Sequence, residues 1–265
     1  MNQTLIELQN VRKSFKVGEA DVEVLKGITI SIKGGEFVII FGPSGCGKST
    51  LLHTLLGLEA PTSGKVLVEN EDFYGSKTDD DRGLYRRHKV GMIYQQPLWV
   101  HALSVAENIA LPLYLLDEDP ESASEKAKKA LEKVNLSEWA NYTPTELSSG
   151  QQQKISLARS LMTDPIMIVA DEPTGNLDTV SGQELLDTFI ELVKGGKTII
   201  MVTHDLEYLK YATRVFHMID GQVVEEYSPT GKARKLDKMV GKRGLNSESV
   251  SVNVRDPELL KKMKI

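Results

Sequence analysis

Short runs of apolar and β-branched residues alternate with glycine-containing turns through the first third of the chain. Runs of this length predict strands at residues 5–11, 28–32, 37–41 and 65–68. The glycines between them predict turns, of which the clearest are at residues 33–35 and 63–64. The first third of the chain is therefore expected to consist mainly of strands.

The pattern becomes helical between residues 119 and 134. Pro120 suits the first position of a helix, and Glu125 and Lys129 are spaced to pair across one turn of an Ala-rich amphipathic segment. Beyond this helical insert, continuous apolar runs at residues 166–170 and 198–202 each follow a helical pattern. Uninterrupted apolar strands are typical of a parallel sheet that is covered on both faces. The pattern therefore predicts an α/β fold.

Composition excludes several classes of protein. The chain has 265 residues, of which 40% are hydrophobic and 26% are charged, a balance typical of soluble globular domains. No apolar run approaches the roughly 18 residues that a membrane-spanning helix needs, and residues 1–10 lack the features of a secretion signal. The single cysteine, Cys46, cannot form an internal disulfide, which suits a reducing compartment. We therefore expect a cytoplasmic protein.

Charge is distributed unevenly along the chain. Residues 231–265 contain ten Lys or Arg and four Asp or Glu, so this tail carries +6 in a chain whose net charge is −5. The acidic remainder should repel nucleic acid, whereas the tail could lie on an anionic membrane or an acidic partner. A solvated extension without a partner is the alternative. The sequence Ser-Pro-Thr-Gly at residues 228–231 predicts a break before the tail.

Residues 42–49 match the pattern G-x-x-x-x-G-K-[ST] of a phosphate-binding loop. The loop follows the apolar run at residues 37–41 and precedes an amphipathic run at residues 50–56, which Gly57 is expected to end. In such a loop, backbone N–H groups converge on phosphate oxygens, Lys48 can reach the β- and γ-phosphates, and Ser49 can ligate Mg²⁺. The sequence therefore predicts a nucleoside triphosphate site.

Two adjacent carboxylates, Asp171 and Glu172, follow the apolar run at residues 166–170. Ligands of parallel sheets bind at the carboxyl ends of the strands, and neighbouring side chains on a strand point in different directions. Asp171 is therefore expected to hold Mg²⁺, and Glu172 is expected to orient or deprotonate an attacking water. Acids that only cap a strand in solvent are the alternative, and the upstream phosphate loop favours the functional interpretation.

The sequence Leu-Ser-Ser-Gly-Gln at residues 147–151 lies between these two motifs and resembles the signature LSGGQ of ABC (ATP-binding cassette) ATPases. The resemblance extends from residue 4 to about residue 227. It places Phe15 where the family stacks an aromatic ring on adenine, Gln95 at the Q-loop and His204 at the switch histidine. A core position is the alternative for Phe15, and adenine stacking is the favoured interpretation.

Further segments narrow the resemblance to one group within the family. Residues 175–178, Gly-Asn-Leu-Asp, resemble the D-loop. The triple Gln at residues 151–153, together with residues 108–113 and 171–178, is similar to the lipoprotein-release, macrolide-efflux and cell-division group (LolD/MacB/FtsE-like).

The resemblance implies a P-loop NTPase fold of the ABC type, with a RecA-like core, an antiparallel β subdomain and a helical subdomain. Residues 1–230 are expected to form the nucleotide-binding domain, with the helical subdomain at about residues 96–160. Residues 231–265 lie outside the resemblance and are expected to form a basic C-terminal extension.

The resemblance also implies roles for individual residues, with ATP and Mg²⁺ as the bound groups. The expected catalytic residues are Glu172, His204, Lys48 and Gln95. The expected metal-binding residues are Ser49, Gln95 and Asp171. The expected nucleotide-binding residues are Phe15, Gly42, Pro43, Ser44, Gly45, Cys46, Gly47, Lys48, Ser49, Thr50, Ser148, Ser149, Gly150, Gln151 and Asp178. The other histidines, at positions 53, 88, 101 and 217, are expected to be solvated or packed.

The function implied is that of an ATP hydrolase that dimerises head to tail around two ATP molecules and drives a separate membrane permease of the LolC/MacB/FtsX type. The surface at residues 95–103 would receive the permease, which would hold the protein on the inner face of the cell membrane. One alternative is a nucleotide-gated signalling scaffold of the cell-division type that transports nothing. Another is a soluble ABC ATPase of assembly or repair machinery, which the absence of a long coiled-coil insertion disfavours. No nucleic-acid partner is expected.

Three details raise further expectations. Ser149 stands where the family usually has Gly, so its Cβ could crowd the nucleotide of a partner copy or require a different φ. Lys154 stands where the group has Arg. Cys46 lies before a helix N-terminus and beside Lys48, a setting that predicts a reactive thiolate. A buried, unreactive side chain is the alternative.

Overall fold

The computed structural model describes residues 3–229 and 234–235. The chain divides into two compact units, the first made of Met1–Ser76 with Val202–Ile265 and the second of Lys77–Met201. The expected boundary at residue 230 and the limits of the helical subdomain stay predictions. The expectations for the basic tail concern residues outside those described, except for Arg234 and Lys235.

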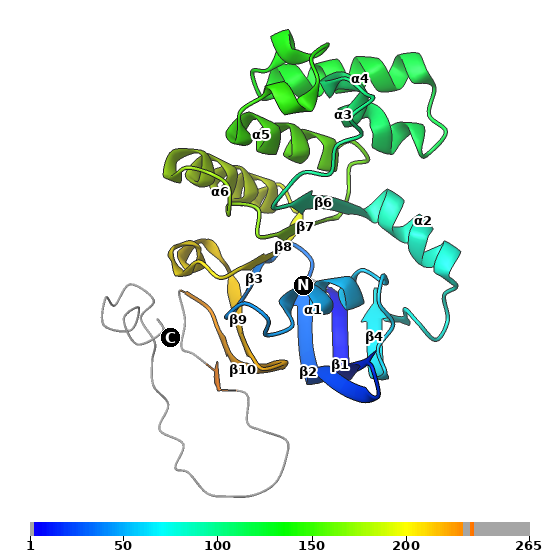
Figure 1. Ribbon diagram of the computed structural model, residues 1–265, viewed down its shortest axis with the longest axis vertical. Coiled ribbons are helices and arrows are strands. Elements are labelled where there is room, and N and C mark those ends of the chain that lie inside the picture. The colour runs from blue at the N-terminus through cyan, green and yellow to red at the C-terminus, as the bar shows by residue number, and fades with distance from the viewer. Residues whose placement is uncertain (1–2, 230–233, 236–265) are drawn as a thin grey trace, which may run out of the picture. The chain divides into compact units, whose positions relative to one another are not determined.

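The first unit contains an antiparallel sheet with the strand order β2-β1-β4-β5 (Figure 1). Alternate residues such as Ile6, Leu8, Ile30, Ile32 and Val66 are buried, which is the pattern of a sheet with one face against a core. The predicted strands lie within the longer strands observed here. These are β1 (Thr4–Val17), β2 (Ala20–Lys33), β4 (Ser63–Val68) and the short β5 (Glu71–Asp72).

The turn predicted at residues 63–64 is wrong, because both residues belong to β4. Gly64 has φ +86°, and a Cβ at this position would lie 2.4 Å from the carbonyl oxygen of Asn10. The register between β1 and β4 shifts between Gln9 and Arg12, opposite this glycine. Gly64 therefore allows two backbones to approach closely at an irregularity inside the sheet. The turn predicted at Gly34 and Gly35 is confirmed.

A second set of strands in the first unit carries the phosphate-binding loop. β3 (Phe37–Phe41) is buried along its whole length and pairs in parallel with β9 (Arg214–Ile219). β10 (Gln222–Tyr227) pairs antiparallel with β9, and the two-residue β11 (Arg234–Lys235) pairs with β10. The helix after β3 is α1 (Lys48–Leu55), and Gly57, with φ +70°, follows its C-cap as predicted. A 3-10 helix, η3 (Leu206–Tyr211), precedes β9.

The second unit contains a parallel pair of strands, β6 (Val90–Tyr94) and β7 (Met167–Asp171). β8 (Thr198–Thr203) begins in this unit, where the N–H of Thr198 donates to the carbonyl of Ile166 over 3.0 Å. The helices α2 (Asp79–Lys89) and α6 (Thr179–Lys194) belong to the same unit. The predicted buried strands are thus confirmed at β7 and β8, and β7 pairs in parallel with β6.

Three helices of the second unit pack around one apolar cluster. They are α3 (Val105–Tyr114), α4 (Pro120–Lys133) and α5 (Ser149–Ser160), accompanied by the 3-10 helices η1 (Ser137–Trp139) and η2 (Pro144–Glu146). Ile109, Leu131 and Ile155 are fully buried in this cluster. The predicted helix at residues 119–134 is α4: Asp119 caps it, Pro120 is its first residue, and Lys129 binds Glu125 over 2.7 Å.

Within the described residues, no helix combines the length and apolar character needed to cross a membrane.

Candidate functional site

The loop between β3 and α1 requires glycine at particular positions. A Cβ at Gly42 would lie 2.1 Å from the carbonyl oxygen of Met218 and 2.9 Å from Cys46 Sγ. Gly45 and Gly47 have φ +79° and +101°, in the left-handed region that side chains disfavour. Gly47 caps α1 without a side-chain hydrogen bond, and the first turn of α1 contains no acidic residue. The N–H groups at this helix end are therefore oriented to receive an anion such as phosphate.

The Lys48 side chain folds across this loop. Its Nζ donates to the carbonyl of Gly42 over 2.8 Å and to that of Pro43 over 3.0 Å, and the residue is 7% exposed. The two carbonyl oxygens satisfy the hydrogen-bonding needs of this buried ammonium group. Ser49, the next residue, is exposed. The structure therefore presents a positive charge at the loop and a hydroxyl beside it.

The thiol of Cys46 differs from the sequence prediction. Cys46 is 4% exposed, and burial raises its pKa, an effect that outweighs the opposing influence of Lys48. Burial disfavours the charged thiolate because it removes the water that would solvate it. The expectation of a reactive thiolate at Cys46 is therefore wrong, and the structure supports the alternative of a buried, unreactive side chain.

We expect Cys46 to resist maleimide labelling at pH 7 in the native protein and to react once the protein is unfolded in urea. Because its pKa is raised, the thiolate fraction stays low at neutral pH and increases only towards alkaline pH. Intact mass reports this site alone, since Cys46 is the single cysteine. Labelling of the native protein as fast as that of the unfolded protein would contradict this expectation.

Phe15 and His204 also belong to the first unit. Phe15 lies on β1, where its ring is half-buried and Lys13 Nζ lies 4.8 Å from the ring centroid. The ring is absent from the buried core, so the core interpretation is not supported for Phe15. His204 is exposed and directly follows β8. Both nucleotide-contacting roles stay predictions.

Asp171 and Glu172 lie at the end of β7 in the second unit. Asp171 is the last residue of the strand, and both side chains are half-buried. Glu172 has φ +48°, a left-handed conformation that is uncommon for a glutamate. The carbonyl of Glu172 accepts a hydrogen bond from the N–H of Gly175 over 3.1 Å, which closes the turn after it. Backbone strain of this kind is concentrated at functional sites.

The structure brings Gln95 together with the segment that resembles a D-loop. A Cβ at Gly175 would lie 2.6 Å from Gln95 Nε2, so a larger residue here would require the Gln95 side chain to move. Asn176 Nδ2 donates to the carbonyl of Gln95 over 3.2 Å. The two motifs are separated by 80 positions or more in the chain and are in direct contact.

The signature segment forms the N-terminus of α5. Ser148 is the N-cap: its hydroxyl accepts from the N–H of Gln151 over 3.3 Å, and Gln151 Oε1 accepts from the N–H of Ser148 over 2.9 Å. This reciprocal pair is a capping box. Ser149 is the first helical residue, exposed and without a positive φ, so the expected need for a different φ is wrong. A first helical position accepts any residue with ordinary helical angles.

Asp178 has a structural role in this structure. It caps α6 by accepting hydrogen bonds from the N–H groups of Val180 and Ser181, each over 2.9 Å, and from Ser181 Oγ over 2.8 Å. These bonds lower the pKa of Asp178 because they favour the charged carboxylate. Its predicted contact with nucleotide stays a prediction.

Two further glutamines hold the signature helix in place, and sequence reasoning assigned them no role. Gln153 is 3% exposed, and its Nε2 donates to the carbonyl of Pro173 over 2.8 Å and to that of Tyr94 over 3.2 Å. It therefore joins α5 to the loop after β7 and to the end of β6. The unusual run of three glutamines was the signal that could have identified it.

Gln152 links the signature to the loop after Gln95. Its Oε1 accepts from Trp99 Nε1 over 2.8 Å, and its Nε2 donates to the carbonyl of Leu147 over 2.9 Å. The Arg159 guanidinium stacks 4.5 Å from the centroid of the Trp99 ring and donates to the carbonyl of Leu98 over 2.7 Å. Residues 98–99 are thus fixed to two turns of α5.

Lys154, which stands where the group has Arg, forms an ion pair with Glu184 of α6 over 2.8 Å.

These features define a P-loop ATPase of the ABC class. The family model for the ABC transporter matches residues 25–175, more than half of the chain. The chain therefore belongs to the ABC transporter family, and it is an ATP-binding subunit with ATPase activity.

Relatives in the curated proteins agree with the LolD/MacB-like group. The lipoprotein-releasing system ATP-binding protein LolD of Aquifex aeolicus is 37% identical over 222 residues, which cover 84% of this chain and 97% of the relative. The macrolide export ATP-binding/permease protein MacB of Wolinella succinogenes is 41% identical over 229 residues, covering 86% of this chain and 36% of the relative.

Solved structures show the same fold. The dimeric structure of MJ0796, a bacterial ABC transporter cassette, has a TM-score of 0.78 and 37% identity, and the match covers 84% of this chain and 98% of that chain. The expected fold class is thus confirmed.

Proposed function

We propose that the chain binds ATP through its phosphate-binding loop and works as one half of a dimer that drives a separate membrane permease. The observation that carries the proposal is the loop at residues 42–47, whose glycines, helix N-terminus and Lys48 together fit a chain of phosphates. In this proposal the backbone of residues 42–50 holds the phosphates, and Lys48 leaves its two carbonyl partners to reach them. Phe15 stacks on the adenine.

The residues assigned to Mg²⁺ have suitable donor chemistry. Ser49 offers a hydroxyl, Gln95 an amide oxygen and Asp171 a carboxylate, and oxygen donors are the ligands that Mg²⁺ prefers. A bound Mg²⁺ would neutralise charge on the phosphates. Glu172 orients and deprotonates the attacking water, and His204 contacts the γ-phosphate.

A second copy of the chain would complete each site. The hydroxyl of Ser148 and the N–H groups at the start of α5 form another helix N-terminus that suits phosphate. We assign Ser148, Ser149, Gly150 and Gln151 to the ATP bound by the opposite copy, with Asp178 nearby. The relative MJ0796, solved as a dimer, supports this arrangement.

Replacing Ser149 with glycine is expected to raise steady-state ATPase activity at saturating ATP. The reason is that Ser149 is exposed at the start of the helix, where its Cβ would meet the partner's nucleotide. Ser149→Ala is the matched control because it keeps the Cβ and removes only the hydroxyl. If Ser149→Gly is no faster than wild type, crowding by this Cβ is excluded.

The permease partner would dock on the segment between Gln95 and Leu103. Leu98 is 67% exposed and Val100 is 42% exposed, so two large apolar side chains face solvent within three residues. Exposed apolar side chains placed together mark interaction surfaces. Through Trp99 and Gln152 this surface is connected to the signature helix. A protein held there by a permease would lie at the inner face of the cell membrane.

We expect Leu98→Asp to prevent association with the permease, because it places a charge in an apolar contact. The measurement is co-purification of the membrane partner from the native host with tagged wild-type or variant protein. Leu115→Asp is the control, since Leu115 is 57% exposed in the same unit but lies outside the proposed surface. Equal recovery of the partner with both variants would contradict the docking surface.

The activity of the recovered partner would also distinguish a transport function from a signalling function. A permease that moves lipids, lipoproteins or drugs when reconstituted with this ATPase supports the transport function. A membrane partner through which the ATPase cycle signals, with no transported molecule, supports the cell-division type of scaffold.

A further inference from the structure

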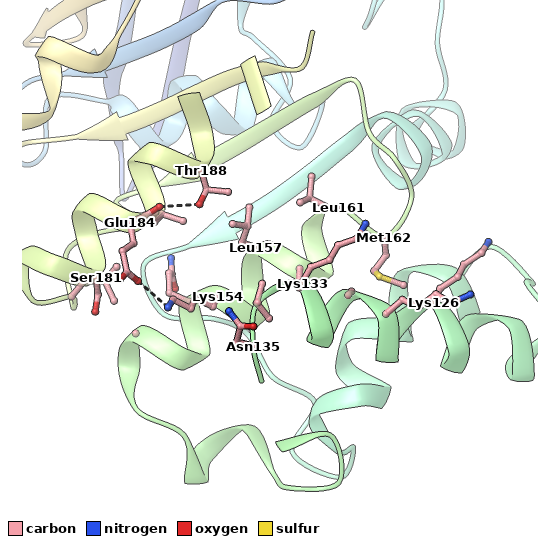
Figure 2. A pocket seen from close by; sticks show the side chains of 18 residues that line it. Lys126, Lys133, Asn135, Lys154, Leu157, Leu161, Met162, Ser181, Glu184 and Thr188 are labelled. Atoms are coloured by element: carbon pink, nitrogen blue, oxygen red, sulfur yellow. Dashed lines mark hydrogen bonds and ion pairs between the residues drawn. The ribbon is translucent and has the colours of Figure 1, made fainter. Parts of the chain in front are cut away.

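A pocket of about 610 Å³ lies in the second unit among α4, α5 and α6, and none of its lining residues belongs to the phosphate-binding loop (Figure 2). Its volume falls within the range of pockets that bind small molecules, about 300–1,000 Å³. Figure 2 shows Lys126 and Lys133 on the α4 side, Leu157 from α5, and Glu184 and Thr188 from α6. Of its lining residues, the proposed function assigns only Gly150 to a ligand.

The apolar part of the pocket is aliphatic. Leu157, Leu161, Met162, Val134 and Leu185 line it, and its described lining contains no aromatic ring. Without a ring to stack on, a planar base or aromatic ligand gains little here. Flexible aliphatic side chains, and Met162 in particular, adapt to the irregular shape of an alkyl chain. The lining therefore favours an unbranched hydrocarbon.

The charged part of the pocket is basic. Four lysines line it, against one carboxylate, that of Glu184. Lys126, Lys129 and Lys154 form ion pairs with Glu118, Glu125 and Glu184 over 2.6, 2.7 and 2.8 Å. In the part of the chain that the structure describes, Lys133 has no ion-pair partner. The pocket thus combines an aliphatic lining with an unbalanced ammonium, which complements an anionic head on an alkyl chain.

We propose that this pocket binds a long-chain carboxylate, a free fatty acid, with the alkyl chain against Leu157, Leu161 and Met162 and the carboxylate at Lys133. Lysine stems add apolar contact while their ammonium groups stay in water. The pocket also includes Gly150 and Ser181, where α5 and α6 are so close that a Cβ on Gly150 would lie 2.8 Å from Ser181 Oγ. A bound chain would therefore lie against the start of the signature helix.

The test is calorimetric titration of the purified full chain with dodecanoate below its micelle concentration. We expect saturable binding of dodecanoate to the wild-type protein. Lys133→Glu should weaken it about ten-fold, because reversing the charge at residue 133 removes its attraction to the carboxylate and adds a repulsion. Lys128→Glu is the matched control: Lys128 is an exposed lysine of the same helix that does not line the pocket. Lys128→Glu should bind dodecanoate with an affinity within about two-fold of wild type.

A second control changes the ligand. Dodecyl maltoside, with the same alkyl chain and a neutral head, should bind at least ten-fold more weakly than dodecanoate.

A second variant tests the pocket itself. Thr188 is half-buried in the lining, so Thr188→Trp should fill the cavity and abolish dodecanoate binding. Circular dichroism and melting temperature show whether this variant folds, and Lys133→Glu decides the question if it does not. Equal dodecanoate affinity in Lys133→Glu and Lys128→Glu would overturn the proposal. So would equal binding of dodecyl maltoside, or binding only to phosphatidylglycerol vesicles.

Discussion

Replacing Glu172 with glutamine is expected to stop ATP turnover while ATP binding is retained. Glutamine keeps the size of the side chain but cannot accept a proton from water, and loss of a general base costs about 10²–10⁴-fold in rate. Because hydrolysis would be blocked after binding, the variant should accumulate as an ATP-bound dimer. Phosphate release measures the rate, and a sizing column with and without ATP measures the dimer.

Glu69→Gln is the control for this experiment. Glu69 is an exposed glutamate in a left-handed conformation, φ +50°. Glu69→Gln therefore makes the same chemical change as Glu172→Gln at a residue with a similar backbone conformation. It should leave both rate and dimerisation unchanged. A Glu172→Gln variant that hydrolyses ATP at the wild-type rate would remove Glu172 from the reaction.

Gly42→Ala is expected to lower the melting temperature and to abolish ATP binding. The added Cβ would lie 2.1 Å from the carbonyl oxygen of Met218, backbone of the neighbouring β9, so either the loop or the strand must move. Overpacking of this kind costs about 1–3 kcal/mol, which corresponds to a decrease of roughly 2–12 °C in a domain of this size. Thermal unfolding measures the first effect, and binding of a fluorescent ATP analogue measures the second.

Gly34→Ala provides the comparison for Gly42→Ala. Gly34 lies in a turn of the same unit, its φ is not positive, and a Cβ there would meet its nearest neighbour, the carbonyl oxygen of Gln3, at 3.8 Å. That distance is an ordinary van der Waals contact, so this variant should melt close to wild type and bind ATP normally. If both variants behave alike, the close approach at Gly42 is not what makes this glycine necessary.

Contiguous motifs were predictable because their function depends on neighbouring residues. The phosphate-binding loop needs glycines, a lysine and a hydroxyl within eight positions, and a strand and a helix on its two sides, all of which can be recognised locally. The same holds for α4, whose cap, first proline and Glu125–Lys129 pair lie within one segment. The buried strands β3, β7 and β8 were equally visible as continuous apolar runs.

Local patterns failed where a residue's neighbour is distant in the chain. Gly64 was expected in a turn, but it permits contact with the backbone of Asn10, more than fifty positions earlier. The strands β9 and β10 mix polar and apolar residues, so they lack the apolar run that identified β3. Whether such a glycine lies in a turn or a strand, and whether a mixed polar and apolar segment forms a strand, depends on the distant segments that pack against it.

The sequence by itself determined that the protein binds and hydrolyses a nucleoside triphosphate. The phosphate-binding loop, the acidic strand end and the signature segment each consist of consecutive residues and can be recognised locally. Tertiary structure decided the environment of those residues. It raised the pKa of the Cys46 thiol through burial, although the adjacent Lys48 had indicated the opposite. It also gave Gln152 and Gln153 their partners, Trp99 and Pro173, which lie 53 and 20 positions away. Burial and long-range hydrogen bonds depend on how distant segments fold together, and for that reason local sequence does not specify them.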